Sequence, residues 1–274
     1  MQFKTVYVDV IEMPKDPKTI NDRTDRWMEL DQLKHVLTHI RSVSDHISFA
    51  LFSDVNEHPN VDQIFTLCYD LGFRFSVTVR SAHFVQWISA YTHSNAISSV
   101  HIPLCLLQEH GCFDTEEQRH NVYTAIHQLK DHNIGVMIDL FSKELNDYHP
   151  KTIQFLSMFG FEFDDSLWQK GFQINLDSQL FIRCCEQKEE VDELPAKTLG
   201  RCYGSVTMLG VMANGNVIPC NHINGKRIVL GNLLTQPIHE IISTEPYVSI
   251  HDGFYKNQLV HPVCQRCPHP RKVF

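Results

Sequence analysis

The sequence predicts an α/β fold, in which a partial, TIM-like (β/α) barrel is followed by a small cysteine-rich module made of a β-hairpin and a short helix. Short apolar runs alternate with stretches of helical periodicity through the first two thirds of the 274 residues. The apolar runs, such as 48–52, lack a polar–apolar alternation, which is typical of parallel strands covered by helices. After about residue 175 the pattern changes to turns, short segments and solitary cysteines.

Six apolar runs in the first part predict strands of a parallel sheet. Parallel strands need helical crossovers, and the runs are far enough apart in the chain to accommodate them. In such folds the functional groups gather at the carboxyl ends of the strands. The predicted strands are 5–11, 47–52, 75–79, 98–103, 135–141 and 161–163.

Apolar residues at helical spacing predict a helix after most of these strands. In the second predicted helix, Gly72 stands where a C-terminal cap is expected, because glycine adopts a left-handed conformation without a steric penalty. The apolar positions are Leu30, Leu33, Leu37, Ile40 and Val43; Val61, Ile64, Phe65, Cys68 and Leu71; Phe84, Val85, Ile88 and Tyr91; and Val122, Tyr123, Ile126 and Leu129.

The chain divides at a charged stretch. Residues 187–195 contain five charged side chains and end in a proline, which is typical of a solvated linker. We therefore predict a barrel portion at 1–186, a linker at 187–195 and a module at 196–274. In the module, Asn214-Gly215 between two apolar runs predicts a hairpin with a type I′ turn, and Pro237 predicts the first turn of a short helix.

Composition narrows the function classes. The net charge of −8, without a basic cluster, argues against nucleic acid as a partner. No apolar run approaches the roughly 20 residues of a membrane span, and no signal peptide is evident at the N-terminus. Nine cysteines without a secretion signal are typical of a reducing compartment. The expectation is a cytoplasmic metalloprotein.

Four cysteines predict a metal site. Cys220 follows Cys202 by 18 positions, and a C-x2-C pair, Cys264 and Cys267, closes the set 44 positions later. Zinc ribbons use two such C-x2-C knuckles to bring four sulfurs to about 2.3 Å from the ion. A single knuckle with two solitary cysteines is a looser arrangement, which favours a [4Fe–4S] cluster. Zinc and unliganded thiols remain the alternatives on spacing alone.

The same region resembles a known module. Cys202, Gly215 five residues before Cys220, Gly231-Asn232-Leu233 and the terminal C-x2-C-Pro are similar to the twitch form of the SPASM module of the radical SAM superfamily. The resemblance implies one auxiliary [4Fe–4S] cluster behind a catalytic barrel, since a full SPASM module has further cysteines for a second cluster. The ligands that it implies are Cys202, Cys220, Cys264 and Cys267.

The front half also resembles a radical SAM barrel, through 58–73 and the strand 75–79, yet it departs from the family at two motifs. The family's CxxxCxxC loop corresponds to 13–23, which contains no cysteine; the first cysteine of the chain is Cys68. The glycine-rich GGEP segment is replaced by 52–55, where side chains obstruct the approach that glycine allows. We therefore expect that S-adenosylmethionine is not bound and that the barrel is a retained scaffold.

Carboxylates on or just after predicted strands are the remaining candidates for chemistry. In a barrel, such residues converge on a common cavity. They are candidates for binding a substrate or a metal, with a relic of an older site or pairing with lysines as the alternatives. Asp54 and Asp139 are the catalytic candidates, with Asp9 and Glu12 beside them.

Several histidines and cysteines have a structural interpretation beside a functional one. Asp31, His35 and His39 share a helical face, where a solvated surface is the expectation and a metal site the alternative. His222 is close enough to Cys220 to tune a cluster, or is an exposed loop histidine. The other cysteines are expected to be buried or loop thiols, and the adjacent pair has a substitute-ligand or redox role as its alternative: Cys68, Cys105, Cys112, Cys184 and Cys185.

Together these observations predict an iron–sulfur protein that is an accessory rather than a catalyst. It would transfer electrons, or present a peptide or small substrate, to a partner enzyme (radical SAM or another redox enzyme) in peptide or natural-product modification, a setting that the resemblance supplies. The first alternative is an enzyme with other chemistry at the barrel mouth, or with an unusual second cluster held by Asp16, Asp22 or a distant cysteine. The second is a binding protein clipped by zinc.

Overall fold

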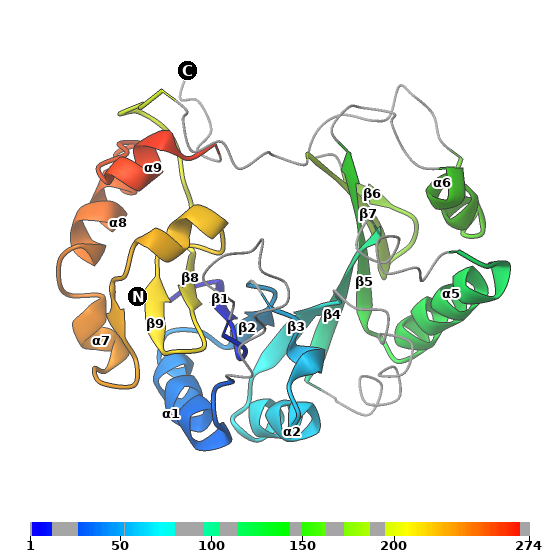
Figure 1. The fold of residues 1–274 in the computed structure, drawn as a ribbon, viewed down its shortest axis with the longest axis horizontal. Helices are drawn as coiled ribbons and strands as arrows, with labels where there is room; N and C mark the ends of the chain where they lie inside the picture. The colour runs from blue at the N-terminus through cyan, green and yellow to red at the C-terminus, as the bar shows by residue number, and fades with distance from the viewer. Residues whose placement is uncertain are drawn as a thin grey trace. The chain divides into compact units, whose positions relative to one another are not determined.

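The computed structural model describes residues 2–12, 27–51, 53–79, 96–104, 114–142, 150–162, 173–186 and 195–268. The chain forms two compact units. One contains residues 1–75 together with 190–274, and the other contains 76–189. Each unit has strands and helices of its own (Figure 1).

The first unit is built on a mixed sheet with the strand order β10-β9-β8-β1-β2, followed by β3, whose first two residues belong to this unit. The central strand β1 pairs in parallel with β2 on one side and with β8 on the other. Beyond β8 the pairing is antiparallel through β9 to β10. The strands are β1 (Thr5–Val8), β2 (His46–Phe49), β3 (Arg74–Thr78), β8 (Met208–Val211), β9 (Asn216–Ile218) and β10 (Gly231–Asn232).

Two helices cover one side of these strands: α1 (Leu30–Arg41) and α2 (Val61–Asp70) (Figure 1). Each carries an apolar stripe at helical spacing, which in α1 is completely buried. The ring of Phe75 on β3 lies between Phe65 of α2, with centroids 5.0 Å apart, and Phe49 of β2, with centroids 5.6 Å apart. These contacts hold α2 against the sheet.

The end of α2 confirms the role predicted for Gly72. This glycine has φ +74°, and its N–H donates to Tyr69 O at 2.9 Å, while Phe73 N donates to Cys68 O at 2.9 Å. Both bonds satisfy carbonyls that the last helical turn leaves without partners. The chain therefore leaves the helix in the direction of β3.

The second unit contains the strand order β4-β5-β7-β6. β4 (Ile97–Pro103), β5 (Gly135–Ser142) and β7 (Leu180–Glu186) are parallel, and β6 (Gln173–Asn175) is antiparallel to β7. The helices of this unit are α5 (Glu116–Asp131) and α6 (Pro150–Ser157).

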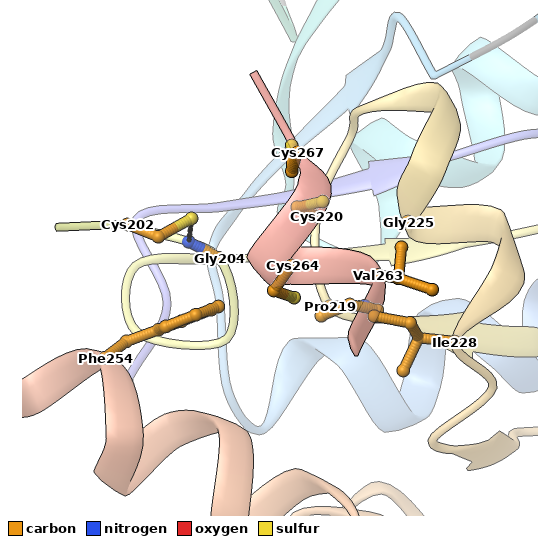
Figure 2. Close-up of a pocket in the computed structure, with 10 residues that line it drawn as sticks. All are labelled: Cys202, Gly204, Pro219, Cys220, Gly225, Ile228, Phe254, Val263, Cys264 and Cys267. Atoms are coloured by element: carbon orange, nitrogen blue, oxygen red, sulfur yellow. Dashed lines mark hydrogen bonds between the residues drawn. The ribbon is translucent and has the colours of Figure 1, made fainter. Parts of the chain in front are cut away.

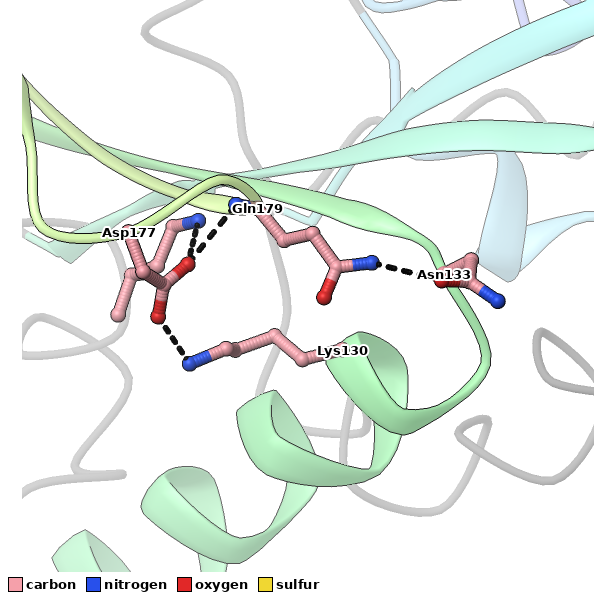
Figure 3. Close-up of polar contacts among 5 residues, drawn as sticks. Lys130, Asn133, Asp177 and Gln179 are labelled. Atoms are coloured by element: carbon pink, nitrogen blue, oxygen red, sulfur yellow. Dashed lines mark hydrogen bonds and ion pairs between the residues drawn. The ribbon is translucent and has the colours of Figure 1, made fainter.

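Polar contacts fasten the turn between β6 and β7 to the end of α5 (Figure 3). Asp177 accepts hydrogen bonds from the backbone N–H groups of Gln179 and Leu180, both at 2.8 Å, and pairs with Lys130. Gln179 Nε2 donates to Asn133 Oδ1 at 3.2 Å. Asn133 follows the helix at φ +59° and takes the capping position that Gly72 takes after α2.

Beyond β8 the chain forms the predicted hairpin with a different turn. Among the turn residues only Gly215 has positive φ, at +83°, so the predicted type I′ turn, which needs two such residues, is wrong. Gly215 N donates to Met212 O at 2.8 Å, and Met212 N donates to Asn216 O at 2.9 Å. A turn ending in one left-handed glycine closes the hairpin instead.

Short helices follow the hairpin, and one of them is the helix predicted at Pro237, with this proline as its N-cap. Pro237 immediately precedes the four-residue helix that it predicts. The helices are a 3-10 turn η3 (Ile223–Arg227), α7 (Ile238–Ile241), α8 (Tyr247–Tyr255) and α9 (Pro262–Arg266); a further 3-10 turn, η1 (Val55–Glu57), follows β2.

The predicted first five strands are confirmed and the sixth is wrong. Phe161, the start of the predicted strand 161–163, is buried but lies outside any strand. The aromatic ring of Phe161 is buried in the core, although its backbone does not pair with a neighbouring strand. The strands β6 and β7 are absent from the sequence prediction, and the predicted helix at 84–91 lies outside the described residues.

The predicted domain boundaries at 186 and 196 stay a prediction, because residues 187–194 are also outside the described part. The pairing of β8 with β1 shows that the cysteine-rich region continues the sheet begun at the N-terminus. None of the helices in the parts of the chain that the structure describes is long and apolar enough to cross a bilayer.

Candidate metal centre

The four predicted ligands line one pocket in the first unit (Figure 2). Cys202 precedes β8 and Cys220 follows β9, so the hairpin brings them back together. Cys264 lies in α9, and Cys267 caps its end. Residues up to 65 positions apart in the sequence therefore meet around one space.

The turn after Cys202 ties the first two cysteines together. Ser205, at φ +57°, donates its backbone N–H to Pro219 O at 2.7 Å, next to Cys220. The buried hydroxyl of Tyr247 donates to Ser205 O at 2.8 Å. This contact anchors the turn to α8.

Helix α9 has its own local determinants. Pro262 stands in its first turn, and His261 Nδ1 accepts a hydrogen bond from Val263 N at 3.2 Å. Gln265 Nε2 donates to Leu259 O at 2.9 Å. One helical turn then separates Cys264 from Cys267, whose N–H donates to Cys264 O at 3.3 Å.

Two glycines keep the pocket open. A Cβ on Gly225 would lie 2.8 Å from Cys220 Sγ, and one on Gly204 would lie 3.0 Å from Pro219 O and 3.1 Å from Cys220 Cβ. All three distances are shorter than normal carbon contacts, so a side chain at either position would displace Cys220. The backbone at these two positions therefore lines one side of the pocket, and we call it the glycine cradle. Only glycine, which has no Cβ, leaves the space beside Cys220 unfilled.

The rest of the lining is apolar, from Pro219, Ile228, Phe254 and Val263. Burial raises the pKa of the Cys202 and Cys264 thiols, and raises the pKa of Cys220 to about 12, with repulsion from neighbouring thiolates adding to the effect. Without a cation Cys202, Cys220 and Cys264 are therefore neutral thiols at pH 7. Binding a metal would replace their protons, since only thiolate is a ligand.

Two nitrogen atoms lie beside the thiols. Gly204 N donates to Cys202 Sγ at 3.5 Å, and His222 Nδ1 lies 3.9 Å from Cys267 Sγ. The backbone of His222 also hydrogen-bonds to Cys220, so this histidine contacts two cysteines of the set. Groups in such positions orient ligands and tune bound metal groups.

The pocket suits an iron–sulfur group in its chemistry. It offers four thiols, which are the ligands that such clusters use, together with an apolar lining and a glycine cradle that leave space beside them. In the described parts of the chain, no set of three or more His, Cys, Asp or Glu side chains is arranged to hold a single ion. The four cysteines therefore surround the pocket as neighbours, without the geometry of a single-ion site.

The carboxylates Asp9 and Asp54 are buried and hold the loop after β2. Asp9 Oδ1 accepts from Ser53 N at 2.9 Å and from the Ser53 hydroxyl. Asp54 Oδ1 accepts from Asn56 N at 3.0 Å and from Asn56 Nδ2 at 2.6 Å, which caps η1. Glu12 is half-buried just after the bridge between Ile11 and Trp27.

Asp139 lies on β5 in the second unit and is also buried. It makes a two-pronged pair with Arg183 on β7, Nε to Oδ1 at 2.7 Å and Nη2 to Oδ2 at 2.9 Å. His101 Nδ1 on β4 lies 3.9 Å from Oδ2. The sequence alternative of a lysine partner is replaced by this arginine; a catalytic role for Asp54 or Asp139 stays a prediction.

The remaining candidates have the following places. His35 and His39 pack ring to ring on α1, with centroids 4.7 Å apart, and Asp31 is exposed on the same helix. Cys68 is fully buried in α2, as predicted. Cys184 and Cys185 lie on β7, opposite Leu140 and Phe141. Cys105, Cys112, Asp16, Asp22 and the loop 13–23 lie outside the described residues.

Sequence reasoning missed Gly204, Gly225 and the apolar lining of the pocket. The available signal was weak: a glycine within five residues of each solitary cysteine. Glycines are common near turns, and only the packing shows that these two face a thiol.

Residues 202–268 match the SPASM family model, described as an iron-sulfur cluster-binding domain. All four pocket cysteines fall within this range. No curated protein matches the chain in sequence.

Solved structures of radical SAM enzymes share the fold. BtrN in complex with AdoMet and 2-DOIA is 14% identical, with a TM-score of 0.53 over 98% of this chain and 94% of that one. Native anSMEcpe with bound AdoMet is 13% identical, with a TM-score of 0.54 over 96% of this chain and 86% of that one. SuiB from Streptococcus suis is 9% identical, with a TM-score of 0.50 over 97% of this chain and 72% of that one. The chain therefore shares the fold of these solved structures, and its residues 202–268 match the iron-sulfur cluster-binding SPASM domain.

Proposed function

We propose that this protein is an accessory iron–sulfur protein, whose module holds one [4Fe–4S] cluster through Cys202, Cys220, Cys264 and Cys267. Its barrel portion serves as a scaffold without S-adenosylmethionine chemistry. The protein passes electrons, or presents a peptide or small substrate, to a partner enzyme.

One observation carries the proposal: the four cysteines line a single pocket inside the matched iron–sulfur domain. The apolar lining and the glycine cradle support it, because they leave space beside the thiols that no side chain fills. A bound cluster supplies one-electron redox chemistry. The chain's own part is to hold four thiolates, exclude water and place His222 next to Cys267.

The scaffold role rests on the sequence before the module. The cluster that cleaves S-adenosylmethionine needs three cysteines, and no cysteine precedes Cys68. Cys68 is fully buried in α2, where burial raises the pKa of its thiol far above the usual range. It is therefore a poor substitute ligand, and it packs as a small apolar residue.

A second candidate is an enzyme that binds S-adenosylmethionine through an unusually ligated cluster. The observation in its favour is the likeness to BtrN and anSMEcpe, whose structures were solved with AdoMet, across nearly the whole chain. The sequence departs from that chemistry at 13–23 and 52–55. We therefore rank it second.

The test is anaerobic quantification of iron, sulfide and zinc per chain, with EPR of the reduced protein. We expect about four irons and four sulfides, as one [4Fe–4S] cluster contains. Cys202→Ser and Cys264→Ser should each reduce iron content severalfold, because each removes a thiolate ligand. Cys68→Ala, outside the pocket, should retain it.

The outcomes separate the candidates. One zinc ion per chain without sulfide would establish a structural zinc site instead. About eight irons per chain would establish a second cluster and contradict the scaffold role. Iron that survives loss of any pocket cysteine would show that the ligands lie elsewhere.

A further inference from the structure

From Leu199 to Gly204, the segment around Cys202 presents alternate side chains to solvent. Leu199 is 64% exposed and Tyr203 is 43% exposed, Arg201 between them is exposed, and Gly200 and Gly204 are buried. Cys202 belongs to the inner set, with its sulfur turned into the pocket (Figure 2). Its immediate neighbours in the chain therefore form an outer surface directly above the metal centre.

A second segment lies alongside the first. Leu199 bridges to Gln258, Gly200 N donates to Asn257 O at 2.9 Å, and Lys197 N donates to Gln265 O at 2.9 Å. The pairing places the exposed Lys256 and Arg266 beside this surface. We call the set Lys197, Leu199, Arg201, Tyr203, Lys256 and Arg266 the basic face.

The charge of this region opposes that of the chain. Residues 195–204 and 253–268 contain four Lys or Arg and no Asp or Glu, whereas the whole chain has a net charge of −8. The nearest acid in the sequence is Asp252 on α8, which pairs with His251 at 3.1 Å. The guanidinium of Arg201 lies over the ring of Tyr203, 5.4 Å from its centroid. The stacking holds the Arg201 guanidinium beside the aromatic ring of Tyr203.

We propose that the basic face is the docking surface for an acidic one-electron carrier protein that reduces the cluster. This inference rests on the proposed function, since it requires a cluster behind Cys202. Opposite charges raise the encounter rate of two proteins, and a small apolar centre suits short-lived complexes. Electron transfer also requires a short path, and the face directly overlies a ligand.

The step is balanced without further reactants. The reduced carrier gives up one electron and is oxidised, and the cluster gains that electron. No bond is formed or broken and no proton is transferred. The acidic carrier, a class of protein that the structure does not contain, is the reductant.

The test measures the rate at which the cluster of the holoprotein is reduced by a pre-reduced acidic [2Fe–2S] ferredoxin, in stopped flow, between low and high salt. We expect a rate constant that falls steeply with salt. Lys197→Glu combined with Lys256→Glu should lower it about tenfold or more at low salt and flatten its salt dependence. Neither residue is adjacent to a cysteine in the chain.

The matched control is Lys34→Glu combined with Arg74→Glu, which makes the same change in net charge at two exposed positions on α1 and β3. Its rate should stay within about twofold of the wild type, because steering depends on where the charge lies. Leu199→Ser should slow reduction even at high salt, where only the apolar contact remains.

Photoreduction with a deazaflavin separates the two proposals. If every variant contains the cluster and is photoreduced, but the carrier reduces all of them equally or without salt dependence, the docking face is wrong and the cluster stands. If the wild type contains no cluster, both proposals fail. Loss of a dimer in the Lys197→Glu, Lys256→Glu variant, with an unchanged rate, would assign the face to a second copy of the chain.

Discussion

At Gly225 one added methyl group reaches Cys220 in the cysteine pocket. Its Cβ would lie 2.8 Å from Cys220 Sγ and 3.1 Å from Cys220 O. We predict that Gly225→Ala retains the fold but displaces this cysteine. Iron should be lost to a chelator about tenfold faster, as is typical when groups that orient a ligand are disturbed.

Gly135→Ala is the control for that experiment. A Cβ there has its nearest neighbour, Ser98 O, at 3.5 Å, which is an ordinary contact. Iron retention should match the wild type, and the far-ultraviolet circular dichroism of both variants should be unchanged. Equal chelation rates in the two variants would mean that the cradle does not shape the site.

His58 is buried and makes hydrogen bonds through both ring nitrogens. The residue is 2% exposed; its Nε2 donates to Met28 O at 3.2 Å, and its Nδ1 accepts from Asn60 N at 3.1 Å. Burial lowers the pKa of this imidazole, although the Met28 carbonyl and Glu29 oppose the shift. Protonation would place a proton on Nδ1, where Asn60 N–H already points.

This geometry predicts a loss of stability in acid. Because the folded pKa lies below the unfolded value of about 6.5, the unfolded state binds more protons there, and stability falls as pH drops below about 6.5. Denaturant unfolding between about pH 7.5 and 5 measures the slope. His58→Gln should be less stable at about pH 7.5, by about 1–3 kcal/mol, with a shallower slope.

His120→Gln provides the comparison, since His120 is exposed on α5. Its slope should equal that of the wild type. His46 is also half-buried with a lowered pKa, so part of the slope should persist in His58→Gln. A slope unaffected by His58→Gln would exclude this residue as a source of acid sensitivity.

At the scale of elements, the turn between β6 and β7 depends on Asp177 (Figure 3). Burial is the largest single effect and raises the pKa of this carboxyl, but Lys130 and the N–H groups of Gln179 and Leu180 together lower the pKa overall. Its contribution is therefore present above the unfolded pKa of about 3.9 and is lost as pH falls below it. We predict that Asp177→Ala costs about 1–3 kcal/mol, through the hydrogen bonds to a charged acceptor.

Hydrogen exchange measures this effect locally. The amides of Gln179 and Leu180 should exchange faster in Asp177→Ala. Lys130→Ala should cost less, about 0–1 kcal/mol, because the ion pair is close to the surface. If Lys130→Ala has the larger effect, the ion pair and not the turn is the stabilising element.

Elements with strong local signals could be predicted from the sequence. Helix α2 is an example, since its apolar stripe and Gly72 act over a few residues. The hairpin at Gly215 is predicted correctly, but its turn type is not, because Asn214 does not adopt the second positive φ. At Phe161 an apolar run predicts a strand that does not form, since burial alone does not distinguish a strand from a loop anchored by an aromatic ring.

At the scale of the whole molecule, the fold of radical SAM enzymes is combined with a sequence that lacks a cysteine before Cys68. We predict that S-adenosylmethionine leaves the EPR spectrum of the reduced protein unchanged, because a cluster with four cysteine ligands has no open iron. Titration with S-adenosylmethionine at fixed protein concentration checks this. A shifted spectrum would reveal an open-site cluster and contradict the scaffold role.

The sequence by itself determined the first five strands, the helices α1, α2 and α5, the identity of the four candidate ligands and the absence of the CxxxCxxC cysteines, because these depend on residue type and short-range spacing. Only the tertiary structure decided that β8 pairs with β1, that Asp139 pairs with Arg183, and that Cys202 meets Cys264 in a glycine-lined pocket. Such contacts join residues far apart in the chain. These long-range contacts depend on how side chains pack in the folded protein, and a local sequence pattern does not contain that information.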